Sequence, residues 1–362
     1  PRRRHTNDRE TALIISQLEN GELTFEKLYE WNIGVELGFI SNRILFEAEY
    51  YKRKSKDLLG TVSTNAVGGD AIKFGNIGEL DADGIELSLN TVNIKNDAFK
   101  WSSSFNISIS DNTITKWDSN ERIEDMTNRS GGNIAGYPRG ALFSIPFAGL
   151  NEEGIPTFYD DKGEKVIHVN LQDREDILDY LKYEGPVTPT TFGGFNNTFT
   201  YKNFKLNTGI SFRYGNKIRL DDFYRNTTFD DYSALPGDLR NRWVLAGDEN
   251  ISNVPSINTL LKENSYRSDG SFNPHDLYNR SDIRVAKGDF IRIKNVRLSY
   301  VLPRKLLPFD KIDNLSFTLS AHNLWLLYSD EKLRGVDPEF HQAGGISLPL
   351  TRTYTLSLNL KF

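Results

Sequence analysis

The end of the chain, residues 351–362, alternates strictly between apolar and polar side chains. The apolar positions are Tyr354, Leu356, Leu358, Leu360 and Phe362, and Thr, Ser, Asn and Lys occupy the positions between them. Because successive side chains of a strand point to opposite faces, this pattern predicts a β-strand with one apolar and one polar face. Such a strand is long enough to cross a bilayer when tilted. A soluble β-sandwich can end on the same kind of strand, so this stretch alone leaves both structures open.

The same alternation recurs along much of the chain and predicts nine antiparallel strands in total. In the first of them, Trp31, Ile33 and Val35 lie opposite Asn32 and Glu36. The predicted strands are 29–39, 44–54, 84–94, 99–111, 195–201, 204–214, 290–302 and 315–327, followed by the final stretch. We therefore expect an all-β fold in which each strand has an apolar and a polar face.

One predicted strand, 290–302, changes register in its middle. Its apolar positions have odd numbers up to Ile293 and even numbers from Val296 onward. One extra residue near Lys294 and Asn295 restores the alternation, which predicts a β-bulge at this point.

The connections between the predicted strands are alternately short and long. The expected long loops are about 55–82, 112–191, 216–288 and 328–350, and residues 1–28 form a polar lead-in or the remnant of another loop. Within the second loop we expect a small hairpin around 151–154 and a short helix over 173–181. Outer-membrane barrels show this asymmetry, with short periplasmic turns and long extracellular loops. Aromatic residues near both strand ends fit the two girdles of such barrels. The predicted fold is therefore a transmembrane antiparallel β-barrel.

The number of strands bears on whether the barrel is complete. With a short turn after the first strand, the first and last strands both run toward the short-turn side, which requires an odd number such as nine. An odd sheet with two free edges leaves backbone groups unpaired in hydrocarbon, which is costly. We therefore expect the chain to be the C-terminal part of a larger barrel, with the remaining strands supplied from elsewhere.

Composition narrows the chemistry that the chain can perform. The 362 residues include no Cys, which excludes a disulfide scaffold, a thiolate zinc site and a Cys nucleophile. With a net charge of −5, the chain lacks the overall basic charge that is typical of nucleic-acid-binding proteins. The mean hydropathy of −0.50 is compatible with a barrel, because lipid-facing and lumen-facing residues average out. The sequence contains no apolar run long enough to form a transmembrane helix. No signal peptide is visible, so an exported protein would lack its N-terminus here.

Candidate site residues are few. The five His are scattered without a zinc-binding spacing, no nucleophile motif is present, and we expect neither a catalytic site nor a cofactor or metal. Ligand contact, if it involves the loops, is expected at Asp221, Asp222, Tyr224 and Trp243 in the aromatic and acidic loop 216–288. Ordinary loop packing is the competing explanation for each of these four residues.

Several stretches, in order and spacing, resemble the C-terminal barrel of the SusC/RagA family of TonB-dependent outer-membrane transporters. The resemblance runs from about residue 26 to the C-terminus, and it rests on the ordered set of motifs. These are Glu26-Lys27, 29–43, Lys56-Asp57-Leu58-Leu59, Asn76-Ile77-Gly78, 84–89, 193–199, 290–300, Leu302-Pro303, Asn323-Leu324, 335–339 and Arg352-Thr353-Tyr354.

The resemblance implies a barrel of about 22 strands with a plug inside it. It also implies a SusD-like lipoprotein lid and TonB-driven import of oligosaccharides or peptides across the outer membrane of a Gram-negative bacterium. By the same resemblance, the strand ending in Phe362 is the signal for barrel assembly. The plug and the TonB box are absent from these residues. Two alternatives stay open: a siderophore-type TonB-dependent receptor without a lid, and a secreted β-rich glycan-binding protein or hydrolase.

Overall fold

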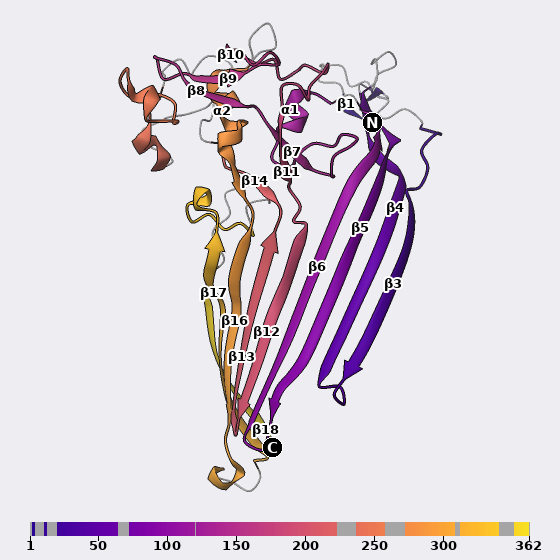
Figure 1. Ribbon diagram of the computed structural model, residues 1–362, viewed down its shortest axis with the longest axis vertical. Helices are drawn as coiled ribbons and strands as arrows, with labels where there is room; N and C mark the ends of the chain where they lie inside the picture. Colours follow the sequence, from indigo (N-terminus) through magenta and orange to yellow (C-terminus); the bar gives the residue numbers. More distant parts are fainter. Residues whose placement is uncertain are drawn as a thin grey trace.

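The chain forms one long, curved sheet with a cap of loops and short elements at one end (Figure 1). The computed structural model describes residues 2–3, 11–12, 20–63, 72–119, 121–222, 237–257, 272–307, 312–339 and 351–361. The short turns lie at the end of the sheet opposite the cap (Figure 1). Among the described residues, no helix is long and apolar enough to cross a membrane.

The sheet contains nine strands, and every neighbouring pair is antiparallel. Their order across the sheet follows their order in the sequence, so the nine predicted strands are confirmed. The strands are β3 (Lys27–Phe39), β4 (Ile44–Ser63), β5 (Ile72–Lys95), β6 (Phe99–Trp117), β12 (Thr191–Tyr201), β13 (Phe204–Tyr214), β16 (Phe290–Val301), β17 (Asn314–Ser329) and β18 (Thr353–Lys361).

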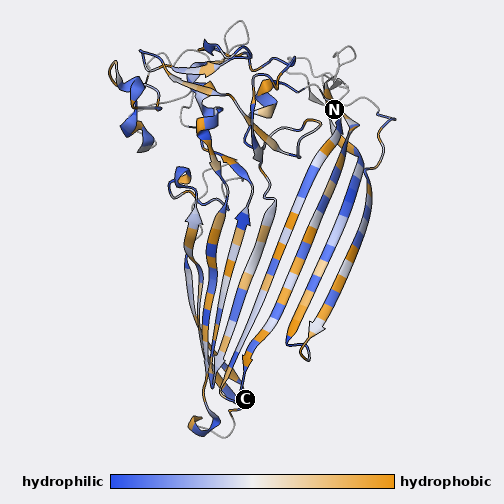
Figure 2. Ribbon diagram, in the orientation of Figure 1, coloured by the Kyte–Doolittle hydropathy of each residue, from blue (hydrophilic) through white to orange (hydrophobic). Residues whose placement is uncertain are grey.

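The strand register brings the apolar positions of all these strands onto one face. A single row of directly paired residues runs from β3 to β17: Leu37, Phe46, Leu89, Phe105, Phe195, Ile210, Ile293 and Trp325. Figure 2 shows the alternation of hydrophobic and hydrophilic residues along the strands. On β18 the same face is largely uncovered by the rest of the chain, with Leu356 75% exposed. A face of this kind needs lipid or another apolar surface to cover it.

The predicted bulge is present in β16. Its pairing with β13 shifts between Ile293 and Asn295, so Lys294 is the extra residue in that ladder. The shift keeps Ile293 and Val296 on the apolar face, and Lys294 donates to Glu339 Oε1 at 2.7 Å. The bulge therefore places a lysine beside the segment that follows β17.

The expected loop over 55–82 is wrong, because β4 and β5 continue through most of it. Their ladder extends from Ser55–Leu80 to Ser63–Ile72, and only 64–71 lie outside the described residues. Glycine is the reason why the alternation was hard to see. A Cβ at Gly60 would lie 2.4 Å from Ile77 Cδ1, and one at Gly78 would lie 2.8 Å from Trp117. These glycines make room for large neighbours instead of breaking the strands.

Strands also occur in all four of the other segments expected to be irregular. β6 continues to Trp117, and β17 continues to Ser329. In the lead-in, β1 (Arg2–Arg3) pairs with β2 (Thr11–Ala12), and β3 already begins at Lys27. Cross-strand pairing extends these ladders beyond the point where the sequence stops alternating.

The cap is built from the two longest loops. The predicted hairpin is confirmed as β8 (Phe147–Leu150) and β9 (Pro156–Tyr159), with β10 (Lys165–Val166) added at its edge. A second pair joins β7 (Ala141–Ser144) to β11 (Lys182–Pro186). The short helical elements of the described residues are α1 (Ile123–Met126), η1 (Gly237–Asn241), η2 (Asp248–Asn250), α2 (Pro274–Asn279), η4 (Asp282–Arg284), η5 (Arg304–Leu306) and η6 (Glu331–Leu333).

The helix expected over 173–181 is wrong. Asp173 Oδ1 accepts from the backbone N–H groups of Arg174 (2.8 Å) and Glu175 (3.2 Å), which favours a turn. Asp176 then adopts a left-handed conformation with φ of 46°, which interrupts a right-handed helix. The apolar residues Ile177 and Leu181 are buried in the core of the cap from these turns.

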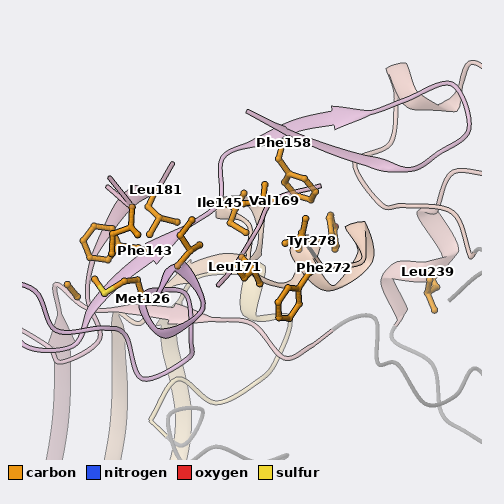
Figure 3. Packing of buried hydrophobic residues seen from close by; sticks show 14 residues of the cluster. Met126, Phe143, Ile145, Phe158, Val169, Leu171, Leu181, Leu239, Phe272 and Tyr278 are labelled. Carbon is orange, nitrogen blue, oxygen red and sulfur yellow. The ribbon is translucent and has the colours of Figure 1, made fainter. Parts of the chain in front are cut away.

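The largest hydrophobic core of the described chain lies in the cap. Its side chains come from α1, β7, β9, α2 and the segments between them, as Figure 3 shows for Met126, Phe143, Phe158, Leu171 and Tyr278. Below the cap, β14 (Lys217–Arg219) pairs with β15 (Val285–Lys287) inside the expected loop 216–288. This ribbon connects the ends of β13 and β16 to the cap (Figure 1).

We expect Leu89→Arg to destabilise the folded full-length protein in phospholipid bilayers by about 2 kcal/mol or more, because a charge then lies on the lipid-facing side. Asn90→Arg, the adjacent change on the polar face, is the matched control. Denaturant titration of unfolding in bilayers measures both, and equal effects of the two variants would contradict the assignment of the faces.

Candidate functional site

The polar face of the sheet has two adjoining hollows near the middle strands. Their volumes are about 590 Å³ and 380 Å³, and both are lined by Asn106, Phe192 and Gly193. The larger one extends over β3, β4 and β5, and the smaller one extends over β13 and β16. In a barrel the polar face lines the interior, so these hollows belong to the lumen wall.

Glycines on the polar face project no side chain from the backbone, and asparagine side chains from neighbouring strands lie over these positions. A Cβ at Gly209 would lie 2.7 Å from Asn295 Nδ2 and 2.8 Å from Asn196 Oδ1. Similarly, a Cβ at Gly194 would lie 3.2 Å from Asn106 Oδ1. The three amides therefore form a shallow polar surface across β6, β12, β13 and β16.

One side of the wall has an unusual concentration of carboxylates. Glu36 lies directly opposite Glu47, and Glu49 lies directly opposite Glu86, so like charges face each other in two cross-strand pairs. Asn32 donates to Glu49 Oε1 at 2.7 Å. Like charges directly opposite each other are destabilising, so this part of the wall favours groups that donate hydrogen bonds or hold positive charge.

The other side of the wall is closed by a buried ion pair. Arg292 Nη2 lies 2.5 Å from Asp337 Oδ1, and the two side chains are 4% and 6% exposed. Arg292 Nε also lies 3.4 Å from Glu339 Oε2. Together with Lys294, these contacts hold segment 335–339 against β16 at the edge of the smaller hollow. Removing one partner of such a pair would leave a buried charge and release the segment.

The predicted loop candidates Asp221 and Asp222 lie just beyond β14. Both carboxylates form ion pairs with Arg129, which comes from the long loop 112–191. Arg129 Nη2 is 3.3 Å from Asp222 Oδ1. Arg284 Nη2 also donates to the Asp221 carbonyl oxygen at 2.6 Å. These two residues therefore tie the two loops together, and a role in ligand contact stays a prediction.

Trp243, the third candidate, packs elsewhere in the cap. Its ring occupies the space that a Cβ at Gly154 would need, and its Nε1 donates to Glu249 Oε2 at 3.0 Å. Within the described residues no contact joins Trp243 to Asp221 or Asp222, so the structure does not bring the candidates together. The fourth candidate, Tyr224, lies outside the described residues.

The final strand β18 pairs with β17 along its length. The side chains of Tyr354, Leu356, Leu358 and Leu360 are all exposed on its apolar face, and Phe362 lies outside the described residues. Their role as an assembly signal stays a prediction.

Arg219 holds the cap to the ribbon below it. The fully buried guanidinium donates to the carbonyl oxygens of Phe143 (2.5 Å) and Ser281 (3.2 Å) and to Ser144 Oγ (3.1 Å). Burial lowers the pKa of Arg219 to about 9, which leaves the side chain charged at neutral pH. A charge that binds several carbonyl groups in this way fixes the position of β7 and η4 relative to β14.

His275, in α2, is another buried polar residue of the cap. Its Nε2 lies 3.1 Å from the Ser256 carbonyl oxygen, and burial lowers the pKa of His275 to about 4. The imidazole is therefore neutral at physiological pH. In the described parts of the chain, no group of three or more His, Asp or Glu residues could hold a metal ion.

Sequence reasoning missed Phe192, Arg219 and the Arg292–Asp337 pair. For Phe192 a signal was available, because its spacing of three from Phe195 puts the two rings on opposite faces of β12. Nothing in the local sequence distinguishes Arg219 or Asp337 from the many solvated charges of the loops. Their roles come from contacts between segments far apart in the chain.

The chain is similar to TonB-dependent receptors along nearly its whole length. It is 27% identical over 397 residues to TonB-dependent receptor P26 of Formosa agariphila, covering 98% of this chain and 36% of the receptor. It is 27% identical over 360 residues to TonB-dependent receptor SusC of Bacteroides thetaiotaomicron, covering 95% of this chain and 32% of SusC. The chain thus spans about a third of the length of these relatives. No family model matches the sequence.

The fold has a counterpart among solved structures. The RagAB peptide transporter superposes with a TM-score of 0.74 at 24% identity, covering 99% of this chain and 38% of the transporter chain. These matches confirm the resemblance to the SusC/RagA family, and they confirm the fold as part of an antiparallel transmembrane barrel.

Replacing Arg219 by Met removes its donors and leaves buried carbonyl groups without partners, at about 1–3 kcal/mol for each group. We expect faster amide hydrogen exchange in β7 and η4 of the full-length protein, with the nine-stranded sheet unchanged. Arg139→Met, at an exposed position of the cap, is the matched control. Unchanged exchange in the Arg219 variant would show that the cap does not depend on this residue.

The cap should also lose stability as the pH falls. The pKa of His275 is about 4 in the folded state and about 6.5 in an unfolded chain, so the unfolded state binds more protons between these values. The stability contributed by the neutral side chain is complete above about pH 6.5 and lost as pH falls toward 4. Exchange-derived opening free energies around α2 should be about 2 kcal/mol lower at pH 5 than at pH 7. His275→Gln should remove this dependence, whereas His168→Gln, at an exposed position, should keep it.

Proposed function

We propose that this chain, which matches TonB-dependent receptors of the SusC/RagA type along nearly its whole length, forms the C-terminal part of the barrel of an importer in the outer membrane of a Gram-negative bacterium. The observation that carries the proposal is the unbroken apolar row from Leu37 to Trp325, opposite a polar wall with two hollows. A sheet with these two faces suits a boundary between lipid and an aqueous lumen.

The rest of the barrel belongs to the proposal as well. β3 and β18 are the edges of the nine-stranded sheet, and unpaired strand edges are costly in hydrocarbon. The relatives are about three times as long as this chain. We therefore expect both edges to pair with further strands of the same transporter, giving a barrel of about 22 strands around a plug. TonB would act through that other part.

A SusD-like lipoprotein is the partner that we propose for the cap. Support comes from the similarity to SusC and to the RagAB peptide transporter. The cap has its own hydrophobic core, and Arg219 fixes it to the ribbon of β14 and β15, so it offers a defined surface rather than loose loops. The substrate in this proposal is an oligosaccharide or a peptide, and the chain binds and transports it without catalysing a reaction.

Purification from outer membranes and uptake assays in cells test the proposal. The full-length transporter should be extracted from outer membranes with detergent and purified through this part of the chain. A lipoprotein should purify with it. Uptake of fluorescently labelled oligosaccharides or peptides should require both the transporter gene and TonB. Purification without any lipoprotein would favour a receptor without a lid, and recovery in the aqueous fraction would favour a secreted β-protein.

A further inference from the structure

We propose that the outward side of β4 binds the phosphorylated headgroup of the outer-leaflet glycolipid through a column of lysines that begins at Lys52. The proposal rests on the importer function, because it requires the sheet to stand in an outer membrane with its long loops outside. The column lies on the lipid-facing side of the wall. β4 is already paired with β3 on one side and β5 on the other, so neither a plug in the lumen nor further strands at the sheet edges would cover it.

The apolar face of β4 changes from hydrophobic residues to lysines at one level. Its even-numbered positions from the start of the strand are Ile44, Phe46, Ala48, Tyr50, Lys52, Lys54 and Lys56. The ladder with β3 has no register shift as far as Lys56, so the lysines point to the same side as Phe46, away from the lumen. They follow one another at about 7 Å, at the end of the strand nearer the cap (Figure 1). In the described sheet β4 is the one strand with three lysines in succession on one face.

The column begins where the apolar band ends. The rings of Trp31 and Tyr50 lie edge to face at the top of the band, with centroids 5.6 Å apart, and Lys52 is directly opposite Trp31. The outward side of β5 is largely apolar from Ile94 to Ile85, which spans roughly 20–25 Å of height on a tilted strand. Aromatic rings mark the headgroup level of such a band. Lys52 therefore lies at the level of the lipid phosphates.

Two of the three ammonium groups are available to a ligand. Within the described residues no ion pair or hydrogen bond engages the side chain of Lys52 or Lys56. Lys54 lies between them, 3.6 Å from Glu79 Oε2 and 3.8 Å from Asp81 Oδ1. Pairs of exposed charges contribute little, so Lys54 can exchange a carboxylate for a phosphate. A lysine ammonium is a compact charge on a long stem, which suits phosphate and lets neighbouring lysines reach one headgroup layer.

Carboxylates limit the site on one side. Asp83 on β5 is directly opposite Lys52, and Asp111 on β6 is directly opposite Asp83. Both carboxylates would repel phosphate, so the bound headgroup lies over β3 and β4 rather than over β5 and β6. Since the chain as a whole has a net charge of −5, the attraction for phosphate comes from this column and not from the overall charge.

On the β3 side the lysines have aromatic neighbours. Trp31 and Tyr29 lie directly opposite Lys52 and Lys54, and the two aromatic residues are 49% and 57% exposed. Amphipathic rings of this kind suit the boundary between acyl chains and a sugar headgroup. Cationic groups beside aromatic rings therefore favour a phosphorylated glycolipid over an anionic phospholipid, which offers no sugar ring.

The test uses the full-length transporter purified from outer membranes and freed of bound lipid by detergent exchange. The probes are diphosphoryl lipid A, the same lipid A after removal of its phosphates, and phosphatidylglycerol. Native mass spectrometry measures the affinity for each probe. We expect diphosphoryl lipid A to bind about tenfold more tightly than either other lipid, and Lys52→Gln/Lys56→Gln to remove that difference. Lys52→Arg/Lys56→Arg, which keeps both charges, should retain it.

Arg53→Gln/Lys205→Gln is the matched control, because it removes the same charge from the lumen side of β4 and β13. It should leave the affinity for lipid A unchanged, and heat-modifiability on gels should show that all variants fold. Equal binding of the three lipids, or an affinity that Lys52→Gln/Lys56→Gln leaves unchanged, would overturn the inference. If uptake depends on TonB although lipid A is not preferred, the importer stands and the lipid site falls. If lipid A is preferred but uptake does not depend on TonB, the lipid site stands and the importer falls.

Discussion

The register of the nine-stranded ladder is the constraint on which the rest of the structure depends. Side chains alternate with a period of two, so a slip of one residue between any two strands would move a whole apolar set onto the polar face. The row from Leu37 to Trp325 shows that no such slip occurs between β3 and β17. At β16 this requires an extra residue, Lys294, to restore the apolar row after Ile293. The bulge therefore lets the apolar positions change from odd to even residue numbers while the apolar side chains stay on the same face of the sheet.

The same register determines where ligand chemistry can be placed. Because one face is reserved for apolar contact, every group able to bind a hydrophilic ligand must come from the alternate positions or from the loops. On those alternate positions glycine has an unusual role: Gly194 and Gly209 let amides from neighbouring strands lie over the backbone. Most side chains on a strand stand perpendicular to the sheet. At these glycines no side chain stands there, so the neighbouring amides lie flat against the backbone and keep their polar groups exposed.

The sequence was informative wherever structure depends on local alternation. It predicted the nine strands, the bulge at Lys294 and the hairpin of β8 and β9, because each leaves a pattern over a few consecutive residues. It failed for the upper part of β4 and β5, where glycines serve the packing of Ile77 and Trp117 and hide the alternation. It also failed for 173–181, where Asp176 breaks a helical pattern and Ile177 packs into the cap core from a turn.

The candidate site was harder to predict for a different physical reason. Arg219 and the Arg292–Asp337 pair act through burial, and burial here is produced by segments more than forty residues apart. A hydrophobic contact would join such segments without fixing their orientation, whereas a buried guanidinium must satisfy donors in defined directions. Both arginines lie where the sheet meets a loop: Arg219 holds the cap, and Arg292 holds segment 335–339 beside the smaller hollow. The loops can then vary in sequence while their position over the lumen wall stays set by two buried charges.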